Sequence, residues 1–351
     1  MINNHELGIQ WNDISMQRSS LMGIAMISVF LFHSIGEWAP VFLYSICLHG
    51  NIGVDIFMFL SALGLSYSLS KNSNIFQFYL RRALRIFPVY WVFMSIVYLF
   101  VGILISVGIM PYEYYRFPHS IWEVIQAYTT IGYWIEGGLY YLWYIPAIIV
   151  LYVFFPLWYI VISRWHYCGI ICLLPSLFIM YCPFQFYDMH LLLIYRIGVF
   201  MLGAVSYSLI KDGGGNYSLL SVLFGFCSFF FYLLRIIIGF NCGWEQIIED
   251  VLFYVSLPCI LLLLAQIGKI VFLNKILSLV GEISLEFYLI HEFILRFMET
   301  LSNFYLHIGR GTQVFWAFLC SLAIAFIVHR MMKYLLFPIH NRNGYREIKT
   351  Y

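Results

Sequence analysis

Long apolar runs with almost no charge recur along this chain, and they constrain its fold more than any other feature. A helix that crosses a bilayer needs about 20 mostly apolar residues. By that criterion we predict about ten spanning helices, at 20–38, 50–70, 84–109, 139–163, 168–183, 189–210, 218–239, 247–268, 276–298 and 314–336. The runs are continuous rather than alternating, which disfavours transmembrane β-structure. The sequence therefore predicts an all-α integral membrane protein of about ten transmembrane helices.

Composition supports the same class. The 351 residues are 62% hydrophobic and 10% charged, whereas an ordinary soluble domain is about 25% charged. The few charged side chains cannot cover a water-exposed surface, so lipid must cover it. The net charge of +2 gives no reason to expect a nucleic-acid partner. Most cysteines lie inside apolar runs without paired metal-ligand spacing, so we expect no metal site.

The positions of the basic residues predict the orientation. Loops that are cytoplasmic carry most Lys and Arg, and a cytoplasmic N-terminus places only Arg116 and Arg310 in outer loops. Both termini are therefore predicted to be cytoplasmic. The expected organisation is a cytoplasmic segment over 1–19, one transmembrane domain over 20–336, and a cytoplasmic tail over 337–351. The charged and aromatic segment 110–138 suits an interfacial loop with an amphipathic stretch better than a span.

The first predicted helix contains a histidine near its outer end. His33 lies about 18 Å along the helix at 1.5 Å per residue, in the sequence SLMGIAMISVFLFHSIGE. Such a histidine is either a packing residue or a functional group. Glu37 follows one turn later and could orient the imidazole. Asp55 lies at a compatible depth in the next helix, so it is either a second partner of His33 or a structural carboxylate bonded to a backbone group or a hydroxyl.

A cluster of arginines follows the second predicted helix. Arg81 and Arg82 precede Arg85 by four and three residues, so the three side chains can share one helical face. At a cytoplasmic membrane edge, such a cluster can simply fix topology or bind anionic lipid. Arginine is also the side chain best suited to bidentate phosphate contact, and a coenzyme with several phosphates is a natural ligand.

The ninth predicted helix is unusually rich in charge for a span. Glu292 precedes Arg296 by one turn, which predicts an internal ion pair. Tyr288 and His291 could face a polar cavity instead. Arg196 falls in the outer half of its own helix, where it could bind an anionic substrate or reach the outer lipid headgroups, and we favour the headgroups.

Four stretches in this order resemble the acyltransferase 3 family, integral-membrane enzymes that acylate surface polysaccharides and related acceptors. They are the first-helix block ending FLFHS, the block NIGVDIFMFLSALGLS, the block YLRRALRIFPVYW, and GEISLEFYLIH near the end. A mid-chain segment, LYYLWYIPAIIVLYVFFPL, is also similar but lacks the acidic residue often found there. The resemblance covers nearly the whole chain.

The resemblance implies a ten-span domain in the bacterial inner membrane, an acyl-CoA donor that approaches from the cytoplasm, and an essential first-helix histidine. The histidine's role falls on His33, the family's acidic position matches Asp55, and its arginine cluster matches Arg81, Arg82 and Arg85. Many members carry an arginine eleven residues before the histidine. Here that position is Met22 and the nearest arginine is Arg18, one turn earlier on the same face, which we expect to replace it.

The chemistry that the resemblance implies is acyl transfer, most simply of acetyl, to a hydroxyl of a cell-surface or lipid-linked saccharide. The hydroxyl needs a base while it attacks the thioester. Neutral His33 fits that role, with Asp55 or Glu37 fixing its tautomer. Tyr288, His291 and Arg196 are candidate substrate contacts. Acyl-CoA enters as co-substrate, and no permanently bound cofactor is expected. The alternatives are a transporter or flippase for a lipid-linked sugar, and a membrane glycan polymerase with a larger outer loop.

Overall fold

A computed structural model describes residues 11–108, 118, 120–136, 142–164, 188–211, 227, 230 and 245–342. These residues are helical and contain no strand, as the apolar runs predict. The elements are α1 (Asp13–Met16), α2 (Arg18–Ser34), α3 (Val41–Cys47), α4 (Ile52–Lys71), α5 (Ile75–Ser106), α6 (Ile121–Tyr128), α7 (Ile131–Glu136), α8 (Tyr144–Arg164), α11 (Asp188–Lys211), α13 (Glu245–Gly268), α14 (Val271–Glu282), α15 (Ser284–Leu301), the π-helix η3 (Ser302–Leu306) and α16 (Arg310–Arg342).

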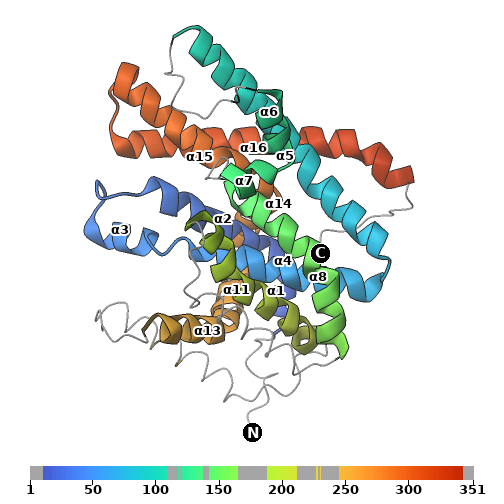
Figure 1. Ribbon diagram of the computed structural model, residues 1–351. Coiled ribbons are helices and arrows are strands. Elements are labelled where there is room, and N and C mark those ends of the chain that lie inside the picture. Colours follow the sequence, from blue (N-terminus) through green and yellow to red (C-terminus); the bar gives the residue numbers. More distant parts are fainter. Residues whose placement is uncertain are drawn as a thin grey trace.

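Helix α2 is central to the packing. It contacts α14, α4, α15 and α13, while α4 in turn packs on α11 and α15 packs on α16. In Figure 1, α2 and α4 lie between α13 at the bottom of the view and α15 and α16 at the top. Side chains at the two ends of α2 therefore meet different neighbours, and the two ends carry the two polar clusters described below.

Glycines allow the closest of these helix contacts. A Cβ at Gly281 of α14 would overlap the backbone carbonyl oxygen of Ser19 in α2, and a Cβ at Gly23 of α2 would overlap that of Leu277 in α14. Gly203 of α11 meets the carbonyl of Phe59 in the same way. Small residues allow such backbone contact between membrane helices, where packing rather than the hydrophobic effect drives association.

Four helices of the described ranges are long and apolar enough to cross a membrane: Val41–Lys71, Ile75–Ser106, Tyr144–Arg164 and Arg310–Leu335. A fifth crossing is possible if the pair Ser256–Gly268 and Val271–Glu282, bent by 116°, counts as one span. The protein is therefore a multi-pass helical membrane protein. Two of the ten predicted spans, 168–183 and 218–239, lie outside the described residues. Those at 20–38 and 189–210 correspond to shorter apolar helices, Arg18–Ser34 and Leu192–Tyr207. Ten spans and cytoplasmic termini therefore stay predictions.

Two predicted helix boundaries need correction. The segment 276–298 is not one helix, because α14 ends at Glu282 and α15 begins at Ser284. Helix α5 begins at Ile75 rather than near 84, because Asn74 caps it by accepting a hydrogen bond from the backbone N–H of Gln77 at 3.0 Å. The loop predicted over 110–138 contains the short helices α6 and α7 within its described part.

Candidate functional site

The C-terminal end of α2, which is the outer end in the predicted orientation, carries the first polar cluster. His33 lies in the last turn of α2, and α15 supplies His291 and Glu292. The rings of His33 and His291 have centroids 5.4 Å apart. His33 keeps 32% of its side-chain surface accessible, whereas Glu292 keeps 11% and His291 is buried. A substrate can therefore reach His33, and the two α15 residues lie beside its imidazole on the buried side.

Glu292 is the carboxylate next to His33. Its Oε2 lies 3.8 Å from His33 Nδ1, and its Oε1 accepts hydrogen bonds from Arg296 Nη2 at 2.7 Å and Arg296 Nε at 3.2 Å. The predicted pair between Glu292 and Arg296 is thus confirmed, and it fixes the carboxylate beside the imidazole. A carboxylate in this position favours a proton on Nδ1, which leaves Nε2 of His33 as the basic nitrogen.

His291 has a defined tautomer. Its Nδ1 lies 2.7 Å from the backbone carbonyl oxygen of Tyr288, so Nδ1 donates and Nε2 carries the lone pair. That Nε2 is buried and has no hydrogen-bond partner among the described residues. Nε2 of His291 is therefore a second hydrogen-bond acceptor close to His33. It is unusual, because most buried polar atoms in proteins have a hydrogen-bond partner.

The two carboxylates expected to orient His33 are placed differently. Helix α2 ends at Ser34 and the chain turns extended at Ile35, so Glu37 does not follow His33 on a helical face. Glu37 is exposed in the turn beyond. Asp55 is buried in the first turn of α4, and its Oδ1 lies 3.5 Å from Arg196 Nε. The expectation that Glu37 lies one helical turn after His33 was wrong. Asp55 pairs with Arg196 in this structure.

Arg196 is buried rather than exposed to lipid headgroups, contrary to the interpretation that we favoured. Besides pairing with Asp55, its guanidinium lies 5.0 Å from the ring centroid of Trp143, at the start of α8. The ion pair and the ring contact compensate for burying this charge. Asp55, Arg196 and Trp143 therefore join α4, α11 and the start of α8.

Tyr288 links α15 to α8 beside this group. Its hydroxyl oxygen accepts a hydrogen bond from the backbone N–H of Tyr144 at 3.4 Å, and the two rings meet edge to face at 5.2 Å. The Tyr288 ring also lies 5.7 Å from His291. Tyr288 is buried, so in this conformation it positions His291 through its carbonyl oxygen rather than offering an open surface to a substrate.

The N-terminal end of α2, which is the inner end in the predicted orientation, carries the second cluster, which consists of arginines. Arg18 begins α2, and its charge interacts with those of Arg82 and Arg85 from α5. The Arg18 guanidinium packs against Gly64 of α4, where an added Cβ would lie 3.5 Å from Nη2 of Arg18. Arg82 also lies over the Tyr152 ring of α8, at 5.9 Å. Arg18 therefore joins the arginine cluster, and its replacement of the missing family arginine stays a prediction.

The cluster is rich in donors. Nε and Nη2 of Arg81 and Nε of Arg82 are buried without a hydrogen-bond partner among the described residues. No carboxylate within the described ranges forms an ion pair with Arg81, Arg82 or Arg85. Several neighbouring guanidinium groups are suited to binding a polyanion, because each can bind phosphate oxygens through a rigid fork of donors.

The two clusters stand about 22 Å apart, because fifteen residues at 1.5 Å each separate Arg18 from His33 along α2.

The sequence predicted His33 and the arginines as site residues, but it did not predict that Glu292 lies beside His33, because it paired Glu292 only with Arg296. The signal was present, since Glu292 adjoins His291 in the same charged helix.

The cluster of His33, His291 and Glu292 is also a candidate metal site. His33, His291 and Glu292 each offer one ligand atom, and these atoms lie within 4.8 Å of one another. However, Arg296 holds the same carboxylate by two hydrogen bonds, and its charge opposes a cation there. The arrangement suits proton transfer better than metal binding.

Comparison with known proteins identifies a family that matches the chain. A family model described as an acyltransferase domain matches residues 21–330. The matched range begins within α2, ends within α16, and includes both the outer histidine cluster and the arginines of α5. No curated protein and no solved structure matches the chain.

Proposed function

The chain belongs to the acyltransferase 3 family, and on that premise we propose that it moves an acyl group, most simply acetyl, from acyl-CoA to a saccharide hydroxyl. It is a membrane acyltransferase. The proposal adds the donor, the acceptor and the bacterial inner membrane as its location. The acceptor is a cell-surface or lipid-linked saccharide, and acyl-CoA is a co-substrate rather than a permanently bound cofactor.

The observation that carries the proposal is the pair of clusters at opposite ends of α2. Arg18, Arg82 and Arg85 gather positive charge at one end, where the phosphates of coenzyme A would bind. His33 and Glu292 stand at the other end, where the thioester would meet the acceptor. The pantetheine arm of the donor is an extended chain that links charged phosphates to a distant thioester, and it fits a site divided in this way.

The residues of the outer cluster have distinct roles in the proposed step. Nε2 of His33 takes the proton of the acceptor hydroxyl while that oxygen attacks the thioester carbonyl carbon. Glu292, 3.8 Å from Nδ1, stabilises the imidazolium that forms. The carbon–sulfur bond then breaks, the new ester is left on the saccharide, and the coenzyme A thiolate recovers the proton from His33. A general base of this kind typically contributes about 10²–10⁴-fold to the rate.

Aromatic side chains close to His33 favour a saccharide as the acceptor. The Phe32 ring lies 5.0 Å from the His33 ring. Trp38, in the turn after α2, keeps 44% of its surface exposed and lies near Gly311 at the start of α16. Flat aromatic faces stack with the C–H faces of sugar rings, and both residues lie near the end of α2 that carries the proposed base.

Mass spectrometry of surface glycans from a deletion strain tests the proposal. Loss of one acyl group per repeat from chains of unchanged length, restored by the wild-type gene, is the expected result. Complementation with His33→Ala should fail, whereas His49→Ala, which changes an exposed histidine after α3, should succeed. Missing or shortened glycan with normal acylation would instead favour the flippase or polymerase.

A further inference from the structure

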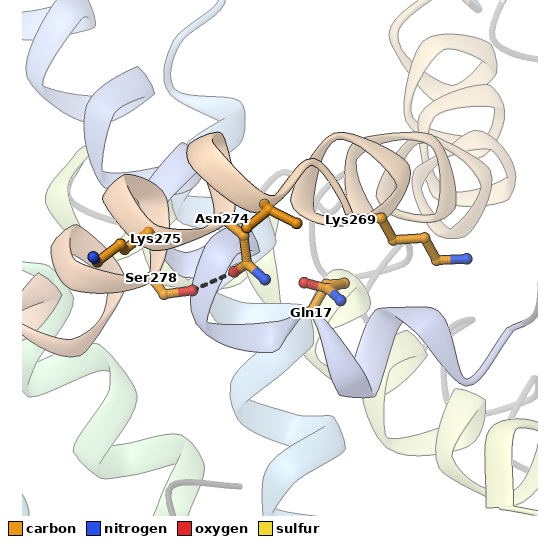
Figure 2. A pocket seen from close by; sticks show the side chains of 6 residues that line it. Gln17, Lys269, Asn274, Lys275 and Ser278 are labelled. Atoms are coloured by element: carbon orange, nitrogen blue, oxygen red, sulfur yellow. Dashed lines mark hydrogen bonds between the residues drawn. The ribbon is translucent and has the colours of Figure 1, made fainter.

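A cavity of about 490 Å³ lies at the inner end of α2, and none of the clustered arginines lines it. Its lining comes from Gln17 before α2, Lys269 in the bend between α13 and α14, and four residues of α14. Figure 2 shows Lys269 and Lys275 at the two ends of this cavity, with Gln17 and Asn274 between them. We call it the α14 pocket. It is separate from the residues assigned to acyl transfer.

The α14 pocket offers donors and few free acceptors. Ser20 and Ser278 both donate hydrogen bonds to Asn274 Oδ1, at 2.6 Å and 2.7 Å. The amide oxygen of Asn274 is therefore satisfied, and its amide nitrogen is left on the side of Gln17 in Figure 2. Two lysine ammonium groups extend the same donor surface. A lining of this kind is complementary to an anion.

The charges around the α14 pocket leave one lysine uncompensated. Lys269 forms an ion pair with Asp13 Oδ2 at 2.6 Å. Lys275 is exposed and has no ion-pair partner among the described residues. Glu282, the remaining carboxylate of α14, interacts with His329 instead. The pocket therefore keeps net positive charge at the end of the molecule predicted to be cytoplasmic.

An exposed apolar surface adjoins this charge. Val271, in the pocket wall, is 84% exposed, and its neighbour Phe272 is 72% exposed. Helix α14 leaves α13 at an angle of 116°, so its first turn is presented at the edge of the membrane domain. Donors beside bare apolar side chains match a ligand that has a phosphate next to hydrocarbon.

We propose that the α14 pocket binds the phosphate of an anionic phospholipid from the cytoplasmic leaflet, with the acyl chains passing over Val271 and Phe272. Anionic lipids are concentrated in that leaflet, and one nearby lysine is worth about 1 kcal/mol of attraction, which is about fivefold in affinity. Lys275 supplies this charge, and Asn274 supplies a neutral hydrogen bond to the phosphate. The bound lipid holds the bend between α13 and α14 at the membrane surface.

Native mass spectrometry of the full chain in detergent tests the proposal with phosphatidylglycerol and phosphatidylcholine as probes. We expect the first phosphatidylglycerol to bind more tightly than phosphatidylcholine. Lys275→Gln should weaken phosphatidylglycerol binding about fivefold and leave phosphatidylcholine binding unchanged, whereas Lys275→Arg should preserve both. Lys333→Gln removes one exposed positive charge from α16 that does not line the pocket, and serves as the matched control. Equal losses in Lys275→Gln and Lys333→Gln would refute the site.

Inorganic phosphate distinguishes a lipid from a free anion. Millimolar phosphate should not displace phosphatidylglycerol, because phosphate alone lacks the contacts with Val271 and Phe272. Displacement by phosphate, together with unchanged lipid binding in Phe272→Ser, would overturn the lipid assignment in favour of a free-phosphate site. The measurement needs no acyl transfer, and His33→Ala should bind the lipid normally. Failure here is therefore separate from failure of the proposed function.

Discussion

Replacing Glu292 by Gln tests which carboxylate supports the proposed base. The substitution keeps the size of the side chain and removes its charge. We expect slower acyl transfer from a folded protein, because the imidazolium formed on His33 loses the negative charge 3.8 Å from Nδ1. The structure predicts that this substitution lowers the rate more than Glu37→Gln does, because Glu37 is exposed beyond the end of α2.

The magnitude follows from the distance and the surroundings. Two unit charges about 4 Å apart interact by about 1 kcal/mol in water and about 4 kcal/mol near a protein surface. Arg296 is bonded to the same carboxylate and offsets part of this attraction. We therefore expect a loss of about 1–3 kcal/mol in the transition state, which is a rate reduction of roughly 5- to 150-fold.

The assay is the initial rate of coenzyme A release at saturating acetyl-CoA, with glycolipid extracted from a deletion strain as acceptor. Glu299→Gln is the matched control, because Glu299 lies on the same helix and pairs with Arg310 at 2.6 Å without contacting His33. It loses a comparable ion pair and should keep its rate. Equal rates for Glu292→Gln and Glu299→Gln would refute the role assigned to Glu292.

Three further predictions concern the donor, the packing and the topology. Arg82→Ala should weaken acyl-CoA binding about ten- to hundredfold, as expected for one charge-assisted hydrogen bond, with acceptor affinity unchanged; unchanged donor affinity in a correctly inserted protein would leave this arginine a topology determinant. Gly281→Ala should lower the free energy of unfolding by about 1–3 kcal/mol, because its Cβ would overlap the Ser19 carbonyl. A Cβ at Gly309 would meet no atom within 4 Å, so Gly309→Ala should leave the stability unchanged in the same melting experiment. Single cysteines should be labelled from outside at position 116 and from the cytoplasm at position 71, and the reverse pattern would invert the orientation.

Helix positions could be predicted where one apolar run forms one helix. The runs at 139–163 and 247–268 correspond closely to α8 and α13. The break between α14 and α15 was missed, because no proline marks it, and the polar residues Glu282 and Ser284 beside Ile283 lie between two apolar runs that together have the length of one span. The backbone leaves regular helix there, at φ −97° and ψ 12°. Such a break depends on tertiary packing, which a hydropathy pattern does not contain.

The candidate site could be predicted in part. His33 and the arginines were identified because each lies in a distinctive local pattern. The partners of His33 were not, because local rules favour a neighbour one turn away and the helix ends before Glu37. Glu292 comes from α15, and Asp55 meets Arg196 from α11. These contacts join residues far apart in the sequence, and a single sequence gives their types but not their pairing.

Transfer of isotope-labelled acetyl from acetyl-CoA by the purified protein tests the central claim most directly. Glycolipid from the deletion strain serves as acceptor, and label in the saccharide is measured by mass spectrometry after the lipid is removed. The account predicts one labelled ester per saccharide unit with the wild-type protein and with His49→Ala, and none with folded His33→Ala. Labelling of the saccharide by His33→Ala at the wild-type level would contradict it. Label found only in water-soluble acetate, whichever acceptor fraction is supplied, would also contradict it.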